Sequence, residues 1–351
     1  MGRSVTRARG EIAARLLVLG GTAFVGRAVV QVALASGYRV TTLNRGVSRS
    51  DLPGVERLRA DRDDPDAMRR ALDGRVFDGV IDVSGLAPAQ VQPVVDELHD
   101  RTPHYTFVST VSTYAEGAYQ IPPGQAISED FDALAGDPDD TSAPDMGRYG
   151  EQKRGCELAV LNQLGPDRVL IARPGPVLGP DDNVHRIPYW LGRMAAGGDV
   201  IAPGHAGRMF QFVDVRDLAK WLVTATSAQL CGTYNVVNPP TRDTWGDWLH
   251  ECGRVTGSVA TVHWIDDQSL MRHGLNTGFD LPLWFGTDLP GFDDRLIRDT
   301  GFRGRPLAQT VEDSWEWLRT HPHPPAGTRP PPLSREAELR ILSAIREDPE
   351  R

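Results

Sequence analysis

Lysine is the scarcest charged residue in this chain. Among 38 lysine and arginine residues in a length of 351, only Lys153 and Lys220 are lysine. Arginine is therefore the default cation of this sequence. Each of the two lysines becomes a candidate for a specific role.

Cysteine is scarce as well, and its spacing excludes two kinds of site. Cys156, Cys231 and Cys252 lie far apart and form no C-x-x-C pair. Neither a disulfide framework nor a metal site is predicted. Such cysteine usage fits a reducing compartment, so we expect a cytoplasmic location.

Long apolar runs and basic stretches are also missing. No apolar run is long enough to cross a bilayer, and a formal net charge of −9 is spread over mixed acidic and basic residues. No basic stripe of the kind that binds a phosphate backbone is present. We therefore expect neither a membrane nor a nucleic acid as partner. Residues 1–14 carry arginine but lack the apolar segment of a signal peptide, so they are predicted to be a disordered leader.

Strands and helices alternate along the first half of the chain. The pattern predicts strands at 16–19, 39–43, 55–59, 79–83, 105–109 and 168–172, and helices at 25–36, 65–72, 89–98 and around Tyr149 and Lys153. This alternation is typical of an α/β protein with a doubly wound parallel sheet, the Rossmann arrangement. We assign residues 15–180 to a dinucleotide-binding domain, to which the chain returns near 208–240.

Beyond Gly179 the alternation becomes irregular. Helices are predicted at 189–196, 215–227, 245–256 and 307–320, and strands at 211–213 and 233–237. These indicate a smaller, interleaved α/β substrate domain formed by 181–207 and 241–320. A Pro-rich linker and a short charged helix, 334–347, are expected within 321–351.

One long segment, 115–147, has no clear periodicity. It holds eight acidic residues and no basic ones. Two interpretations stay open: a lid over a site, or a solvated excursion.

A glycine-rich turn follows the first predicted strand. Small residues occupy positions 20, 23 and 26, where a chain must turn tightly and let a pyrophosphate approach the start of a helix. The turn predicts a dinucleotide site. Its expected contacts are Gly20, Thr22, Ala23, Phe24, Val25 and Gly26.

The end of the second strand bears on which dinucleotide is bound. An acidic residue there usually grips the ribose of NAD, whereas this chain has Asn44 and Arg45. An arginine suits a 2′-phosphate, with Arg27 as a possible helper, so NADP(H) is favoured over NAD(H). After the third strand, Asp61 and Arg62 are candidates for contact with the adenine edge, with a solvated turn as the alternative.

Tyr149 and Lys153 form a Y-x-x-x-K pattern on a predicted helix. The i, i+4 spacing places the phenol and the ammonium on one face. A phenol with a pKa of about 10 is a poor acid or base at neutral pH, and a nearby cation lowers that pKa. The pair is thus predicted to be catalytic. Lys220, with Arg216 four residues before it, is expected to be a solvated cation instead.

These motifs, in their order, resemble one family. The glycine turn, the hydroxyl-rich strand end that leads to Tyr114, the Tyr149–Lys153 pair, and the later segments around Arg173 and Asp214 are similar to the extended short-chain dehydrogenase/reductases, the NAD-dependent epimerase/dehydratase family. The resemblance covers about 15–320. The form of the glycine turn and the tail resemble an actinobacterial-type subgroup of reductases and epimerases.

The resemblance implies roles for individual residues. Thr110, four positions before Tyr114, matches the family's catalytic hydroxyl and would orient the substrate oxygen, with Ser112 as the second choice. Tyr149 would exchange a proton with that oxygen, and Lys153 would lower its pKa and hold the ribose. The remaining cofactor contacts implied are Val83, Ser84, Gly85, Pro174 and Gly175.

The substrate is less well indicated. Nucleotide-sugar members of the family commonly have a polar residue and an arginine where this chain has Pro176 and Phe210, although Arg208 is near. We therefore expect an NAD(P)-dependent oxidoreductase acting on a carbonyl or hydroxyl of a small substrate, such as a secondary metabolite. The alternatives are a nucleotide-sugar epimerase or dehydratase with recycled NAD, and a non-catalytic dinucleotide sensor. Candidate substrate contacts are Ser112, His185, Trp190, Arg208 and Trp284. A homodimer is expected only by analogy with the family.

Overall fold

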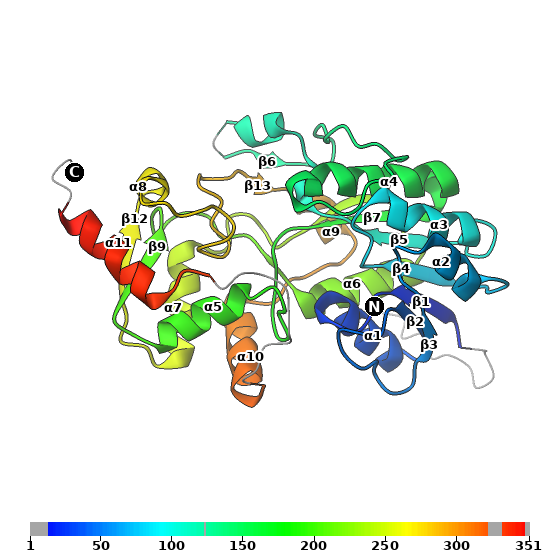
Figure 1. The fold of residues 1–351 in the computed structure, drawn as a ribbon, viewed down its shortest axis with the longest axis horizontal. Helices are drawn as coiled ribbons and strands as arrows, with labels where there is room; N and C mark the ends of the chain where they lie inside the picture. The colour runs from blue at the N-terminus through cyan, green and yellow to red at the C-terminus, as the bar shows by residue number, and fades with distance from the viewer. Residues whose placement is uncertain (1–12, 123, 322–331, 348–351) are drawn as a thin grey trace.

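The computed structural model describes residues 13–122, 124–321 and 332–347 (Figure 1). Two parts are visible in Figure 1: a sheet with helices on both sides, and a smaller, mainly helical part that holds the last helix. Residues 1–12 of the predicted leader and 322–331 of the predicted linker lie outside the described residues. In the described ranges, no helix is long and apolar enough to cross a membrane.

The larger part is built on a seven-stranded sheet in the order β11-β7-β5-β4-β1-β2-β3. Every neighbouring pair in it is parallel. Its strands are β1 (Arg15–Leu19), β2 (Arg39–Asn44), β3 (Glu56–Arg59), β4 (Gly79–Asp82), β5 (Tyr105–Val108), β7 (Val169–Pro174) and β11 (Gly232–Val236). The predicted doubly wound α/β sheet is confirmed. Because the strand order reverses between β1 and β4, the sheet provides a crevice at their carboxyl ends.

Helices cover both faces of this sheet. One face carries α1 (Phe24–Ala35) and α6 (Val215–Ser227), and the other carries α2 (Pro65–Leu72), α3 (Pro88–Leu98) and α4 (Tyr149–Leu164). Successive strand residues point to opposite faces. Leu16 and Val18 of β1 accordingly join the α1/α6 core, and Leu17 and Leu19 join the other. A strand buried on both faces is uniformly apolar, which is why β1 was predictable.

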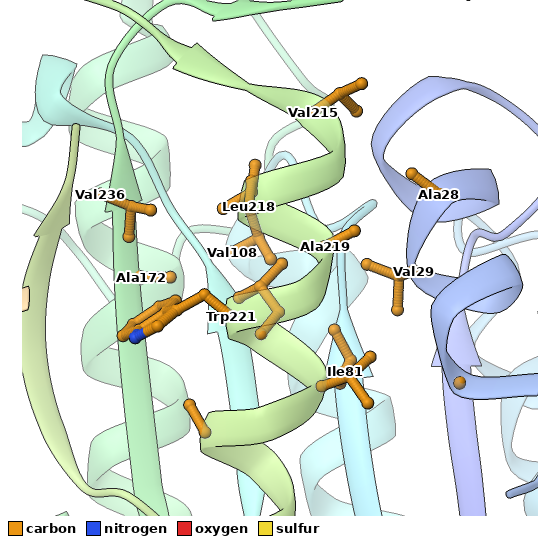
Figure 2. Close-up of a cluster of buried hydrophobic side chains, with 14 of the residues drawn as sticks. Ala28, Val29, Ile81, Val108, Ala172, Val215, Leu218, Ala219, Trp221 and Val236 are labelled. Carbon is orange, nitrogen blue, oxygen red and sulfur yellow. The ribbon is translucent and has the colours of Figure 1, made fainter. Parts of the chain in front are cut away.

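Figure 2 shows the core beneath α6. Leu218 and Trp221 of α6 lie over Val108 and Ala172 of the sheet, and Val29 of α1 packs beside Ala219. The small side chain of Ala219 lets α1 and α6 approach closely. This contact anchors α1, whose first turn faces the crevice.

The smaller part has a core of its own. It contains α5 (Arg186–Ala195), α7 (Trp245–Thr256), α8 (Asp267–Arg272), α10 (Leu307–Thr320) and α11 (Arg335–Glu347), with the parallel pair β9 (Asp199–Pro203) and β12 (Thr261–Ile265). The predicted helices at 245–256 and 307–320 are confirmed. The β9–β12 pair was not predicted, since β12 is only partly buried and shows weak alternation. Leu342 and Ile345 of α11 are buried in this core, so the last helix belongs to it.

Short elements join the two parts. They are β8 (Val177–Leu178), which pairs with β10 (Val213–Asp214), and α9 (Arg295–Asp299) beside β11. Asp214 caps α6 and accepts a hydrogen bond from Thr310 of α10 at 2.8 Å. The chain thus crosses between the parts several times.

The acidic segment 115–147 is fastened rather than free in its described residues. It contains η2 (Glu116–Gln120), β6 (Ala126–Ile127) and η3 (Met146–Arg148), and β6 pairs with β13 (Gly291–Phe292). Its Leu134 donates a backbone hydrogen bond to Thr113, and Gly136 lies against Gly155 of α4, where an added Cβ would be 2.4 Å from a backbone nitrogen. Its described residues are therefore packed against α4 rather than solvated throughout, and the lid stays a prediction.

Candidate active site

The glycine turn between β1 and α1 is shaped for a close approach of a ligand to the backbone. Gly20 and Gly21 have φ angles of 105° and 100°, in the left-handed region that favours glycine. A Cβ at Gly26 would lie 2.5 Å from the backbone nitrogen of Gly21. Three glycines are therefore required by the geometry, and the start of α1 lies directly against the turn. Ala23, between them, is the N-cap residue of α1.

The same turn meets the segment that follows β4. A Cβ at Gly20 would lie 2.7 Å from Cγ2 of Val83, and one at Gly26 would lie 2.9 Å from the same atom. Val83, Ser84 and Gly85 therefore flank the turn at the strand-order reversal. A helix N-terminus that adjoins such a cradle suits a pyrophosphate, so the described residues fit a dinucleotide.

Lys153 is buried at the carboxyl end of β5. Its side-chain nitrogen donates to the carbonyl oxygens of Gly85 and Val108, both at 2.7 Å, and lies 4.1 Å from the centroid of the Phe107 ring. Burial lowers the pKa of this ammonium group below its usual value. An ammonium has three donors, so the two carbonyls leave one donor with which the group can hold a ribose hydroxyl. Lys220, in contrast, is exposed on α6.

Tyr149 begins α4, one turn before Lys153. Its position against the hydroxyl-bearing turn η1 (Val111–Thr113) is set by the residue that follows it, because a Cβ at Gly150 would lie 2.3 Å from the carbonyl oxygen of Ser112. Only glycine permits this approach. The structure thus brings the start of α4, where Tyr149 lies, against the turn that carries the predicted hydroxyl residues.

Thr110 and Ser112 are linked to each other in that turn. Thr110 Oγ1 accepts a hydrogen bond from the backbone nitrogen of Ser112 at 3.1 Å and donates to its hydroxyl at 3.2 Å. Thr110 is buried, with 8% of its surface exposed, whereas Ser112 is exposed. Both hydroxyls therefore adjoin the start of α4, and the assignment of the catalytic one to Thr110 stays a prediction.

We expect Gly150→Ala to lower both stability and turnover. The added methyl group meets the backbone of Ser112, which has little room to move, and overpacking of this kind costs about 1–3 kcal/mol. Gly192→Ala in α5 is the matched control: no described atom lies within 4 Å of its added Cβ, and alanine improves a helix interior by up to about 1 kcal/mol. Melting temperatures and initial rates check both. Wild-type values for Gly150→Ala would contradict the contact between α4 and η1.

The loop after β2 carries an exposed arginine, not an acid, at the position predicted to contact the adenosine. Arg45 is 56% exposed and lies 3.8 Å from Asp61 in a solvent-exposed pair. Asn44 is already used, because its amide donates to Asp51 at 2.9 Å and its oxygen accepts from Gly46. Asp51, the acid of this loop, is buried and also accepts from Thr42 and Arg59.

Arg62 has a partner that the sequence did not reveal. Its guanidinium donates two hydrogen bonds to Asp82, at 2.6 and 2.7 Å, and a third to Ser84 at 3.0 Å. The pair is buried, whereas Asp61 is exposed. Contact of Asp61 with an adenine edge therefore stays a prediction, and the Arg62 guanidinium faces the protein interior. The sequence feature that could have indicated this pair is Asp82 itself, an acidic residue at the end of the otherwise apolar strand β4, where a buried carboxylate needs a cationic partner.

Two predicted substrate contacts are corrected. Trp190 and Trp284 are 0% and 1% exposed and lie in the core of the smaller part, where their indole nitrogens donate to Pro282 and Asp267. Both indole rings fill this core, so neither side chain has exposed surface with which to contact a ligand. Arg208 is held by Asp267 and Asp288. His185 is partly buried at the start of α5.

The remaining predicted cofactor contacts lie at the end of β7. Pro174 is its last residue, and a Cβ at Gly175 would lie 2.8 Å from Val237. Their contact with a nicotinamide stays a prediction. In the described part of the chain, no group of three or more metal-ligating side chains is placed to hold an ion.

Residues 16–237 match the sequence profile of the NAD dependent epimerase/dehydratase family. The chain belongs to this family. The match spans the glycine turn, the η1 hydroxyls, Tyr149 and Lys153, and it ends just after β11. The predicted family is confirmed. Its description is that of NAD-dependent epimerases and dehydratases.

Two curated relatives resemble part of the chain. The chloroplast stem-loop binding protein of 41 kDa b from Arabidopsis thaliana is 25% identical over 220 residues, which are 58% of this chain and 53% of that protein. The 2′-dehydrokanamycin reductase of Streptomyces kanamyceticus is 32% identical over 196 residues, 53% of this chain and 51% of the reductase. The chain thus spans about half the length of the curated relatives it matches.

Solved structures of the family share the fold. The UDP-glucose 4-epimerase of Thermotoga maritima, determined with UDP-glucose, aligns with a TM-score of 0.67 at 16% identity and covers 88% of this chain and 100% of its own. That of Thermus thermophilus, determined with NAD, gives 0.66 at 20% identity, with 87% and 99% covered. At these identities the likeness supports the two-part architecture and nothing finer.

Proposed function

We propose that this family member is an NADP(H)-dependent oxidoreductase that interconverts a carbonyl and a hydroxyl group on a small organic substrate. The observation that carries the proposal is the close contact of α4 with η1 at Gly150, since α4 begins with Tyr149 and η1 carries Ser112 and is capped by Thr110. Lys153, one turn further along α4, is fixed at the same site by the carbonyl oxygens of Gly85 and Val108.

Each side chain has a task in reduction. The Thr110 hydroxyl turns its one hydrogen from Ser112 to the substrate carbonyl oxygen and orients it, and Tyr149 gives that oxygen its proton. Lys153 stabilises the phenolate that remains, because an ammonium favours the charged form of a nearby phenol. The nicotinamide, when bound, supplies the hydride. In oxidation Tyr149 takes the proton back.

A nucleotide-sugar substrate is less well supported. The family position that often holds a cation against a diphosphate is Phe210, which is 5% exposed and stacked on Trp248 at a centroid distance of 4.9 Å. The neighbouring Arg208 is bound through both terminal nitrogens to Asp267. A diphosphate would have to break that fork before it could use the arginine.

The relative that reduces 2′-dehydrokanamycin suggests the substrate class to test first. Ketones of amino sugars are cationic, and the segment 115–147, which leads into Tyr149, has eight acidic residues and no basic ones. A panel of such ketones with NADPH is therefore the first assay. Consumption of NADPH in proportion to product supports a reductase, and turnover without net consumption indicates an epimerase or dehydratase. Dinucleotide binding with no turnover on the panel indicates a sensor, and RNA binding is to be tested in that case because of the stem-loop binding relative.

Cofactor choice gives a separate prediction. Arg45→Asp should weaken NADPH binding by about 10- to 100-fold, since a hydrogen bond to a charged group contributes about 1.5–3 kcal/mol. NADH affinity should hold or rise, because an acid there can bind a ribose hydroxyl. Fluorescence titration with each cofactor measures both. Arg319→Asp, which makes the same charge change at an exposed site on α10, should alter neither, and equal losses for both cofactors in Arg45→Asp would contradict the 2′-phosphate site.

A further inference from the structure

Asp82 is a buried anion that the mechanism above does not use. It ends β4 with none of its surface exposed, and its carboxylate accepts five hydrogen bonds. Two come from Arg62, and one comes from the Tyr105 hydroxyl at 2.9 Å. The last two come from the backbone nitrogens of Ser84 and Gly85, at 3.1 and 3.2 Å. A fully buried ion pair does not by itself stabilise the fold, because the free energy lost by removing both charges from water is about as large as the free energy gained from their attraction.

The position of the pair indicates what else it does. Gly85 donates its N–H to Asp82 and accepts, through its carbonyl oxygen, the hydrogen bond of the Lys153 ammonium at 2.7 Å. Side chains close around this glycine, since an added Cβ would lie 2.6 Å from Val91 and 3.0 Å from Phe107. One residue thus connects the buried pair to the ammonium.

We propose that Asp82, held by Arg62, is a positioning residue for Lys153: it fixes the Gly85 carbonyl that orients the ammonium toward Tyr149 and the ribose. This inference rests on the proposed function, but Asp82 and Arg62 act on Lys153 through Gly85 and are not themselves proposed to contact the substrate. Arg62 also holds Ser84 through its hydroxyl. The Arg62–Asp82 pair therefore fixes both Ser84 and Gly85, which flank the glycine turn.

The charges around Lys153 decide the sign of the effect. Burial disfavours the charged form of Lys153, Asp82 from β4 and Glu157 from α4 favour it, and Arg62 opposes it. Asp82→Asn removes the charge that holds Arg62, so the Gly85 carbonyl and the ammonium that it orients are fixed less firmly and the charged form of Lys153 is less favoured. Lys153 then stabilises the Tyr149 phenolate less well, so the pKa of the catalytic phenol should rise.

The test compares pH profiles. For Asp82→Asn, kcat should fall by about 10- to 100-fold, the loss that a misplacement of about 1 Å can cause, with little change in the KM of the ketone. In the oxidation direction the rise of rate with pH should move to higher pH. Tyr105→Phe keeps the ring in the core and removes one donor from Asp82, so it should shift the profile in the same sense by less. This variant keeps the test open if Asp82→Asn folds poorly.

Glu338→Gln is the matched control, because it breaks a second buried ion pair that is remote from the site. Glu338 of α11 is 1% exposed and binds Arg193 at 2.7 Å. It should lower the melting temperature and leave the pH profile unchanged. A profile and a kcat/KM in Asp82→Asn and Tyr105→Phe that match those of Glu338→Gln would overturn the proposal and assign Asp82 to stability alone.

A binding measurement separates this inference from the proposed function. If the wild type transfers hydride to no ketone, the proposed function fails, and NADPH titration then judges the positioning role. Weaker NADPH binding in Lys153→Ala and Asp82→Asn, with unchanged binding in Glu338→Gln, supports it. Wild-type affinity in Asp82→Asn, beside weakened affinity in Lys153→Ala, overturns it.

Discussion

Replacing Tyr149 with phenylalanine is expected to lower turnover by about 10²- to 10⁴-fold, the usual contribution of a positioned proton donor. The change removes one hydroxyl and keeps the ring at the start of α4. Lys153 lies one turn further along the helix, and its hydrogen bonds to the carbonyl oxygens of Gly85 and Val108 are not disturbed. NADPH affinity should therefore stay close to that of the wild type.

Rates with the ketone panel and NADPH titration together check this expectation. Tyr119→Phe is a suitable control, because Tyr119 is a half-buried tyrosine whose hydroxyl donates to the carbonyl oxygen of Val111 in η1 at 3.1 Å. It removes a hydroxyl from the same neighbourhood but not from the proposed proton path. Turnover in Tyr149→Phe that equals that of Tyr119→Phe would exclude the phenol as the proton donor.

The catalytic pair could be predicted because its geometry is local. A spacing of four residues on a helix determines that Tyr149 and Lys153 share a face, whatever lies around them. The same holds for the glycine turn, in which strand, turn and helix follow one another within about a dozen residues. The four helices α2, α6, α7 and α10 begin and end where their apolar periodicity predicts.

Contacts between distant segments were not predictable in this way. Arg62 was assigned to the cofactor because it follows β3. Its partner Asp82 is twenty residues away at the end of β4, and β1 and β2 lie between β4 and β3 in the sheet. No spacing rule joins them. The identity of such a pair depends on the strand order, which brings the end of β4 to the loop after β3.

Aromatic residues were misassigned for a related reason. The residue type of Trp190 and Trp284 is the same whether a tryptophan lines a ligand pocket or fills a hydrophobic core, so the sequence does not distinguish the two uses. The smaller part has a limited number of apolar residues with which to bury its helices, and these large side chains supply much of that buried surface. Burial, which the sequence does not state, decided between the two uses.

The largest effect on stability is expected at Glu157 of α4. Its carboxylate is fully buried and accepts two hydrogen bonds from Arg173, at 2.9 and 2.7 Å, and one from Arg154 at 2.9 Å. Arg173 also lies 4.7 Å from the centroid of the Tyr114 ring. Glu157→Gln leaves this buried guanidinium without a counter-charge, which typically costs about 3–5 kcal/mol.

Thermal unfolding measures that loss, and we expect the melting temperature to fall by roughly 10 °C at neutral pH, at about 2–4 °C per kcal/mol. Glu316→Gln is the control, because Glu316 pairs with Arg319 on the surface of α10, where both side chains are about 60% exposed. Exposed pairs contribute little, so its melting temperature should match the wild type. Equal effects of the two substitutions would show that the buried pair is neutral for stability.

The pH dependence of the difference gives a second check on Glu157. Burial alone would raise its pKa, but the hydrogen bonds and charge of Arg173 outweigh burial and hold the pKa below the usual 4.5. A carboxylate with a lowered pKa stabilises the fold above the unfolded-state pKa, and that stability is lost as the pH falls. The wild type should therefore lose its advantage over Glu157→Gln progressively below about pH 4.5. An advantage that stayed constant down to the acid limit of folding would mean that packing, rather than the charge of Glu157, accounts for the loss.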